Sequence, residues 1–189
     1  MGCWSVYSRQ TLCRRLKSSR IFLRSTRRCS EVILKTSKGD ITIELYGDMP
    51  ITTGNFKNLV SRGIYDGTIF HRIIPGFVIQ GGDPNTISGS RDTWGQGGPG
   101  YSIDAEISNI KHEKYVVSMA RGADINSAGS QFFIVLDHSP WLDGKYTVFG
   151  EVTSGKDIVD KIAALETNSQ DQPVNPENAI IKKITIISN

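Results

Sequence analysis

The sequence predicts a mainly β protein, built as a closed antiparallel barrel that is capped by two α-helices. Many short apolar segments alternate with turns rich in glycine and proline, and only two segments have the periodicity of an amphipathic helix. Short strands with few helices favour a barrel, because closure of the sheet removes exposed strand edges. No apolar run approaches the roughly 18 residues of a membrane-spanning helix, so we expect no membrane partner.

Residues 1–30 differ in composition from the remaining chain, so we predict a basic leader at 1–30 and one folded domain at 31–189. The leader carries eight of the 22 basic residues, six serines and no acidic residue. This composition is typical of an organellar transit peptide, which predicts a location in the mitochondrial or another organelle matrix. A disordered basic arm, or a start codon assigned too far upstream, is the alternative and favours a cytoplasmic protein.

The distribution of charge and cysteine excludes several kinds of site. Outside the leader, 14 basic residues stand against 19 acidic ones, so the net charge of +3 does not indicate a nucleic-acid-binding surface on the domain. All three cysteines lie in the leader, which leaves the domain without a disulfide, a cysteine-ligated zinc or a cysteine nucleophile. His71, His112 and His138 lack the spacing of a metal motif. We therefore expect no metal and no cofactor.

The elements of the domain follow from its apolar patterns. Residues 32–36 and 41–46 alternate around a turn and predict a β-hairpin. Pro50 then opens a helix over 51–62 that is expected to end at Gly63, and a second helix is expected at 156–165. The other expected strands are 68–72, 77–80, 115–120, 131–136, 147–151 and 180–187.

Residues 83–104 have little periodicity and predict a long irregular loop. Such a loop inside a compact domain is usually functional. Asp104 and Glu106 alternate around Ala105 and are expected to face solvent from a strand.

The familiar motifs of hydrolysis, phosphoryl transfer and dinucleotide binding are missing. Residues 95–100 (GQGGPG) match the pattern G-x-G-x-x-G, but no strand precedes them and no helix can begin in the residues that follow. The chain also has no G-x-S-x-G elbow and no Walker A loop. We reject a dinucleotide site and expect neither of these chemistries.

Three segments, in contrast, form a specific set. They are residues 70–83 (FHRIIPGFVIQGGD), residues 118–121 with 126–134 (SMAR and NSAGSQFFI), and residues 141–150 (WLDGKYTVFG). Their order and spacing resemble the cyclophilin family of peptidyl-prolyl cis-trans isomerases over about residues 32–187, and the long loop is similar to that of single-domain prokaryotic-type members. The resemblance implies an eight-stranded antiparallel barrel closed by two helices, with a substrate groove on its outside.

The resemblance also implies the site, residue by residue. Arg72, Gln80 and Phe77 would be catalytic. The substrate-binding residues would be Val78, Ala120, Arg121, Gln131, Phe133, Trp141, Leu142 and Tyr146, and Gly89 would lie at the edge of the groove. The implied partners are proline-containing peptides and client proteins, with cyclosporin as a further ligand because Trp141 is present. The implied state is a monomer.

Three residues depart from the commonest pattern of the family. Val78 stands where methionine is frequent, which predicts a slightly shallower pocket. Arg121 stands where asparagine is frequent, at a position expected to act chiefly through its backbone. Tyr146 replaces a frequent histidine and keeps an aromatic ring with a polar tip.

The chemistry expected of this set is rotation about an X-Pro bond, whose barrier of roughly 18–20 kcal/mol comes from C–N resonance. We expect Arg72 to stabilise the lone pair that develops on the nitrogen of the twisted amide, and Gln80 to orient the guanidinium. Apolar side chains would hold the proline ring. Phe70 and Phe132 are expected in the core instead, by strand alternation.

The predicted function is therefore a peptidyl-prolyl cis-trans isomerase that assists protein folding. The alternative from another class is a non-catalytic module or scaffold that binds proline peptides. A third hypothesis, a nucleic-acid binder that acts through residues 1–30, predicts salt-dependent binding that is lost when the leader is deleted.

Overall fold

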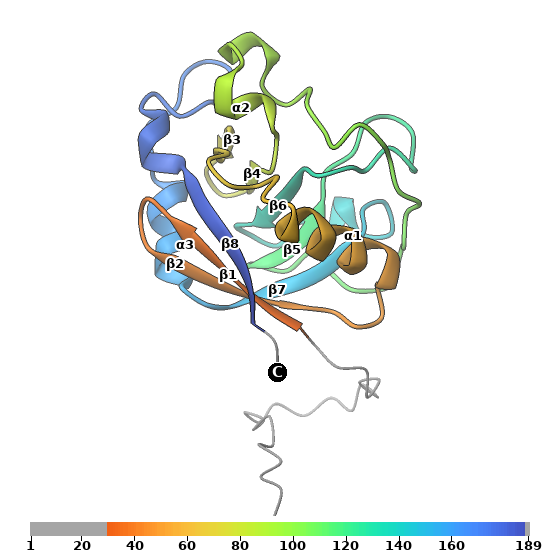
Figure 1. Ribbon diagram of the computed structural model, residues 1–189. Helices are drawn as coiled ribbons and strands as arrows, with labels where there is room; N and C mark the ends of the chain where they lie inside the picture. Colours follow the sequence, from red (N-terminus) through yellow and green to blue (C-terminus); the bar gives the residue numbers. More distant parts are fainter. Residues whose placement is uncertain (1–29, 188–189) are drawn as a thin grey trace, which may run out of the picture.

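The computed structural model describes residues 30–187, which form one eight-stranded antiparallel sheet with three α-helices (Figure 1). The strands are β1 (Ser30–Thr36), β2 (Asp40–Leu45), β3 (Arg72–Ile74), β4 (Val78–Gly81), β5 (Val116–Met119), β6 (Phe132–Val135), β7 (Val148–Ser154) and β8 (Ile181–Ile187). The helices are α1 (Pro50–Ser61), α2 (Asn85–Ser88) and α3 (Lys156–Ala163), with short 3₁₀ turns at Arg91–Thr93, Pro140–Leu142 and Pro176–Ala179. The predicted leader lies outside the described residues, apart from Ser30, which begins β1.

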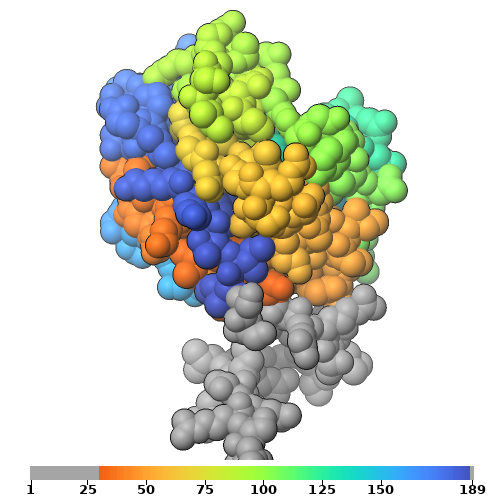
Figure 2. Space-filling view, in the orientation of Figure 1, coloured from red at the N-terminus to blue at the C-terminus, as the bar shows by residue number. Residues whose placement is uncertain are grey.

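The prediction of eight antiparallel strands is confirmed, and that of a closed barrel is confirmed only in part. The strand order is β3-β4-β6-β5-β7-β2-β1-β8, so β3 and β8 are the two edges of a curled sheet. Between these edges the structure has a single bridge, Ile69 with Ile180, and a few backbone hydrogen bonds around it. Figure 2 shows the segment after α1 lying against β8 on this face, where the Gly67 N–H donates to the Ile181 carbonyl.

Two expected elements differ from the structure. Residues 68–72 do not form one strand: Ile69 makes an isolated bridge with Ile180, its N–H donates to the Thr86 hydroxyl, and the strand begins only at Arg72. The loop predicted at 83–104 contains the one-turn helix α2, which raises the number of helices from two to three. No helix within residues 30–187 is long and apolar enough to cross a membrane.

The interior of the curled sheet is filled by its own side chains. Phe56 of α1 meets Tyr65, Phe132 and Phe149 with ring centroids 5.0, 5.6 and 5.3 Å away. Phe70 and Phe132 are fully buried, as strand alternation predicted. Burial of each such side chain contributes about 1.5–3 kcal/mol to stability. Because this space is occupied, a ligand site has to lie on the outside of the sheet.

The start of α1 depends on a residue more than fifty positions away. Met49, before the helix, provides no side-chain cap. The Glu106 carboxylate instead accepts the N–H groups of Ile51 (3.1 Å) and Thr52 (2.7 Å), where the helix dipole favours negative charge. The expectation that Asp104 and Glu106 face solvent from a strand was therefore wrong in two respects. Neither residue lies in a strand, and Glu106 is half-buried against the helix.

We expect Glu106→Ala to lower the free energy of unfolding by about 0.5–2 kcal/mol, because two helical N–H groups lose their acceptor. Urea denaturation followed by circular dichroism measures the change. The matched control is Glu166→Ala, which removes an exposed carboxylate and should stay within about 0.5 kcal/mol of the wild type. Equal stability of the two variants would contradict the capping role.

Candidate active site

Two adjoining cavities open on the outside of the sheet. The first, here the Arg72 cavity, has a volume of about 350 Å³, and the second, the glycine-loop cavity, has about 610 Å³. Nine predicted site residues line the Arg72 cavity: Arg72, Phe77, Val78, Gln80, Ala120, Arg121, Phe133, Leu142 and Tyr146. Gln131 lines the glycine-loop cavity, together with residues 95–102. Gly89 lines neither cavity.

Trp141 also lines neither cavity. Its ring packs against that of Phe77 with centroids 5.7 Å apart, and 56% of the residue is exposed. Trp141 therefore forms a flat apolar surface beside the Arg72 cavity rather than a part of its wall.

The floor of the Arg72 cavity is apolar because β4 and β6 place alternate side chains on opposite faces. Ile79 and Phe132 point into the main core, whereas Val78 and Phe133 belong to a second buried cluster. Leu142 completes this cluster at the cavity, and Phe77 and Tyr146 pack against it partly buried. The arrangement forms a shallow socket for a small apolar ring.

The polar rim of the cavity comes from the register of β3 and β4, which sets Arg72 opposite Gln80. The Gln80 amide donates to the Gln131 side chain at 2.9 Å, and the Gln131 amide donates to the carbonyls of Gly95 and Gly97. Within residues 30–187 the structure has no hydrogen bond between Gln80 and the Arg72 guanidinium, so an orienting role of Gln80 stays a prediction. Through Gln131 this pair joins the strands to the glycine-rich loop.

The charged partner of Arg72 is Asp171, which the sequence reasoning missed. Arg72 Nε lies 3.7 Å from Asp171 Oδ2, and both side chains are about half exposed. Neither Nη1 nor Nη2 of Arg72 donates a hydrogen bond to a residue in the range 30–187. Asp171 is held by its backbone, which has a left-handed φ of 60°, and its carbonyl accepts the Ile73 N–H at 2.8 Å. No sequence motif marks this carboxylate, because the turn that carries it is a hundred residues from β3.

The Arg121 side chain is part of the wall between the two cavities. Its Nε and Nη2 donate to the Lys145 carbonyl, and its Nη1 donates to the carbonyls of residues 122 and 123. The guanidinium lies 4.7 Å from the centroid of the Tyr146 ring. We expected position 121 to act chiefly through its backbone. The structure shows that its side chain also adds a positive charge to the cavity wall, held in place by backbone carbonyls.

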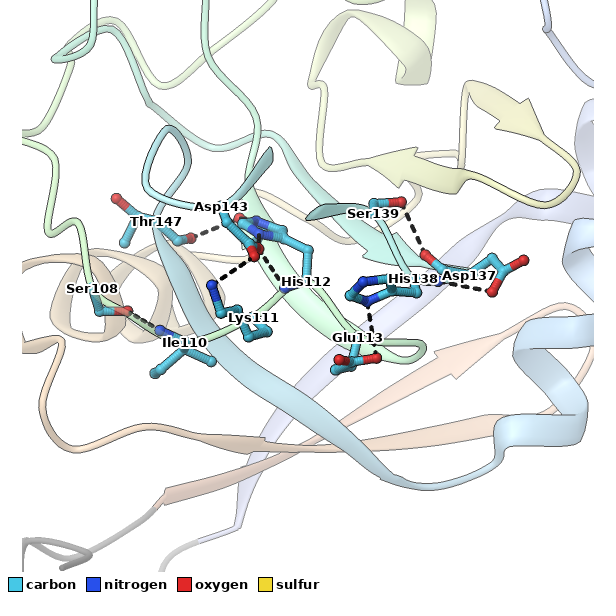
Figure 3. Close-up of polar contacts among 11 residues, drawn as sticks. Ser108, Ile110, Lys111, His112, Glu113, Asp137, His138, Ser139, Asp143 and Thr147 are labelled. Atoms are coloured by element: carbon cyan, nitrogen blue, oxygen red, sulfur yellow. Dashed lines mark hydrogen bonds and ion pairs between the residues drawn. The ribbon is translucent and has the colours of Figure 1, made fainter. Parts of the chain in front are cut away.

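A polar cluster of His112, Asp143 and Lys111 lies next to Phe133 of the socket, and Figure 3 shows the polar contacts within this cluster. His112 Nδ1 lies 3.0 Å from Asp143 Oδ1, and Lys111 Nζ lies 3.1 Å from the other carboxylate oxygen. The His112 ring stacks on Phe133 with centroids 6.2 Å apart. Burial opposes ionisation of Asp143, but hydrogen bonds from His112 and Lys111 outweigh it and lower its pKa to about 2.

The same cluster has the order serine, histidine, carboxylate, because His112 Nε2 lies 3.2 Å from Ser118 Oγ. It is not a nucleophilic triad. Ser118 is fully buried and lines neither cavity, and its hydroxyl also lies within hydrogen-bond distance of the Thr147 carbonyl. The role of these groups is to hold the floor of the socket.

The three histidines lie apart, as expected. His71 is buried beside the Arg72 cavity, and neither of its ring nitrogens has a hydrogen-bond partner. Burial lowers the pKa of His71 against the opposing effect of Asp83. His138 lies 3.2 Å from Glu113, away from the His112 cluster (Figure 3). No group of three potential ligands for a metal ion occurs within residues 30–187.

We expect the free energy of unfolding to rise with pH between about 5 and 7. Burial lowers the pKa of His112 against the opposing effect of the Asp143 carboxylate, which accepts a hydrogen bond from the ring, so the unfolded chain binds more protons than the folded protein in this range. His112→Asn should make the dependence on pH less steep, as measured by urea unfolding at each pH. Unfolding at pH 8, where both states carry a neutral imidazole, gives the cost of the substitution itself. An unchanged slope in the variant would contradict a neutral buried His112.

Comparison with known proteins agrees with this geometry. The family model for "Cyclophilin type peptidyl-prolyl cis-trans isomerase/CLD" matches residues 31–186. The isomerase ppi1 of Schizosaccharomyces pombe is 44% identical over 160 residues, covering 83% of this chain and 99% of the relative. The isomerase cypE of Dictyostelium discoideum is 45% identical over 153 residues, covering 80% and 94%.

Solved structures show the same fold. A crystal structure of a cyclophilin type peptidyl-prolyl cis-trans isomerase from Cryptosporidium parvum superposes with a TM-score of 0.77 at 35% identity, covering 86% of this chain and 99% of that one. A second crystal structure of that protein, in the presence of the dipeptide Ala-Pro, gives a TM-score of 0.76 at 35% identity, covering 84% and 99%. From the sequence match over 31–186 and the shared fold, this chain belongs to the cyclophilin-type peptidyl-prolyl cis-trans isomerase family.

Proposed function

We propose that this protein accelerates the cis-trans isomerisation of X-Pro bonds in peptides and in folding proteins. The observation that carries the proposal is the pairing of an apolar socket with a guanidinium at its rim. Val78, Phe133 and Leu142 form the socket, and Arg72 lines the same cavity with both Nη groups free. A proline ring fits the apolar socket. The amide nitrogen of that proline would then lie next to the Arg72 guanidinium.

Isomerisation needs no bond to break, so the enzyme has only to bind the twisted amide more tightly than either planar form. When the C–N bond rotates out of plane, the nitrogen lone pair leaves conjugation and becomes a hydrogen-bond acceptor. A donor from Arg72 stabilises that state and interacts little with the planar amide, whose nitrogen accepts no hydrogen bond. The guanidinium stays charged at any working pH, so the donor is always available.

The other residues hold the peptide and the arginine. The proline ring is held by four apolar side chains, those of Phe77, Val78, Phe133 and Leu142. Rotation about the X-Pro bond therefore turns the residue before the proline. Gln80, which is held by Gln131, presents its amide group to the peptide where the two cavities join. Asp171 acts on Nε of Arg72 and leaves the Nη groups for the substrate.

We expect Arg72→Ala to lower kcat/KM on an X-Pro peptide by about 10²–10³-fold, the usual effect of losing one preorganised donor. The Kd for the peptide should change far less, because the donor acts mainly in the twisted state. NMR exchange spectroscopy measures the isomerisation rate, and a chemical-shift titration measures the Kd.

The matched control for this experiment is Arg62→Ala, which removes an exposed arginine at the end of α1 and should leave the rate unchanged. If the wild type binds the peptide without accelerating isomerisation, the protein is instead a binding module for proline peptides. Equal rates for the wild type and Arg72→Ala would exclude Arg72 as the donor.

We expect Asp171→Asn to lower kcat by about twofold to fivefold with little change in Kd, because an exposed ion pair contributes about 0.2–1 kcal/mol. Asparagine tolerates the left-handed backbone, so this variant removes the charge without the strain of alanine. Asp157→Asn, which breaks an exposed ion pair with Lys161, is the control. A loss that appears in Kd and not in kcat would show that Asp171 does not position Arg72.

A further inference from the structure

The walls of the two cavities differ in charge from the rest of the domain. Residues 31–189 carry 14 basic and 19 acidic side chains, which is a net negative charge. The residues that line the two cavities nevertheless include two arginines, Arg72 and Arg121, and no carboxylate. The substrate groove is therefore a positive site on a negatively charged domain, which favours approach by an anionic segment.

Of the two arginines, Arg121 has the uncompensated charge. Arg72 faces Asp171 at 3.7 Å, so part of its charge is already balanced. Arg121 makes no ion pair within residues 30–187. The hydrogen bonds of its guanidinium go to backbone carbonyls, which occupy its donors and leave its charge in place.

The two acidic residues next to these walls accept backbone N–H groups, which leaves their charge in place, but neither residue lines a cavity. Asp83 is fully buried, and its carboxylate accepts the N–H groups of Asn85 and Gly95. Asp124 lies on the exposed turn after Arg121, where its carboxylate accepts the Asn126 N–H. Neither carboxylate pairs with the guanidinium of Arg121.

The Arg121 guanidinium is also fixed in place. Three backbone carbonyls hold it from one side, and the Tyr146 ring lies 4.7 Å from it. A cation that is already ordered loses little side-chain entropy when it meets an anion, so the interaction is stronger than with a mobile surface lysine.

We propose that the isomerase selects proline segments that carry a glutamate or aspartate side chain in the glycine-loop cavity beside Arg121. This inference rests on the proposed function and names its substrate class. The cavity, of about 610 Å³, has room for such a side chain, and its other walls are neutral: glycine backbone with Gln96, Ser102 and Ser127. Gln96 and Ser102 can donate hydrogen bonds to a carboxylate, whereas the Ser127 hydroxyl already donates to the Asp124 carbonyl. An extended peptide whose proline occupies the socket would place a neighbouring side chain in this cavity, since the two cavities share Gln80, Ala120 and Arg121.

The experiment uses a matched set of Ala-Pro peptides. Glu, Gln or Lys is placed in turn at the second and third residues before the proline and at the first and second residues after it. NMR exchange spectroscopy gives kcat/KM for each peptide at 50 mM and at 500 mM salt. At one of these positions, the Glu peptide should exceed its Gln counterpart by about threefold to tenfold at low salt, and the Lys peptide should fall below it. The ratio should approach one at high salt.

The variant that tests the assignment is Arg121→Gln. Because the Glu/Gln ratio is taken within each protein, any general loss of activity in the variant cancels. The ratio should fall to about one in Arg121→Gln and remain at the wild-type value in Lys182→Gln. The control removes an exposed cation on β8, outside both cavities.

Two results would overturn this inference alone: equal values for Glu and Gln peptides at every position, or an unchanged ratio in Arg121→Gln. In both, the Gln peptides would still be isomerised, so the proposed function would stand. Failure of the wild type to accelerate isomerisation of any peptide would overturn the proposed function and this inference with it.

Discussion

Strand alternation is the constraint on which the site depends. In β4 and β6 one set of side chains fills the curled sheet, and the other set forms the floor of the Arg72 cavity on its outside. Phe132 and Phe133 are adjacent in sequence and serve opposite sides of one strand. The packed interior holds the strands in register, and that register sets Arg72 opposite Gln80. The geometry of the rim is thus a consequence of how the core packs.

Electrostatics then adjusts this rigid frame. Asp171 is held on a turn with a left-handed backbone, so its carboxylate meets Arg72 without a long flexible side chain. The polar groups of the His112 cluster lie next to the aromatic floor, and both ring nitrogens of His112 have a hydrogen-bond partner. This satisfied network holds the floor in one position. Arg121 is anchored by carbonyls rather than by acids, which is why it keeps its charge at the wall.

The sequence predicted best what depends on local pattern. Alternation located most of the strands and assigned Phe70 and Phe132 to the core, and the motifs placed nine predicted residues in one cavity. The failures concern contacts between distant parts of the chain. Glu106 reaches α1 across more than fifty residues, and Asp171 reaches Arg72 across about a hundred. Residues 68–72 have the composition of a strand, but Ile69 makes only an isolated bridge, and its N–H donates to the hydroxyl of the distant Thr86. Local propensity carries no information about such partners.

The filled interior separates two kinds of evolutionary change. Residues of the outer wall, such as Arg121 and Tyr146, contact backbone and one another rather than the main core. Replacing Arg121 removes no residue of either buried cluster. Substitutions at the cavity wall can therefore accumulate during evolution. The aromatic interior around Phe56 tolerates little change, because its aromatic neighbours are fully buried.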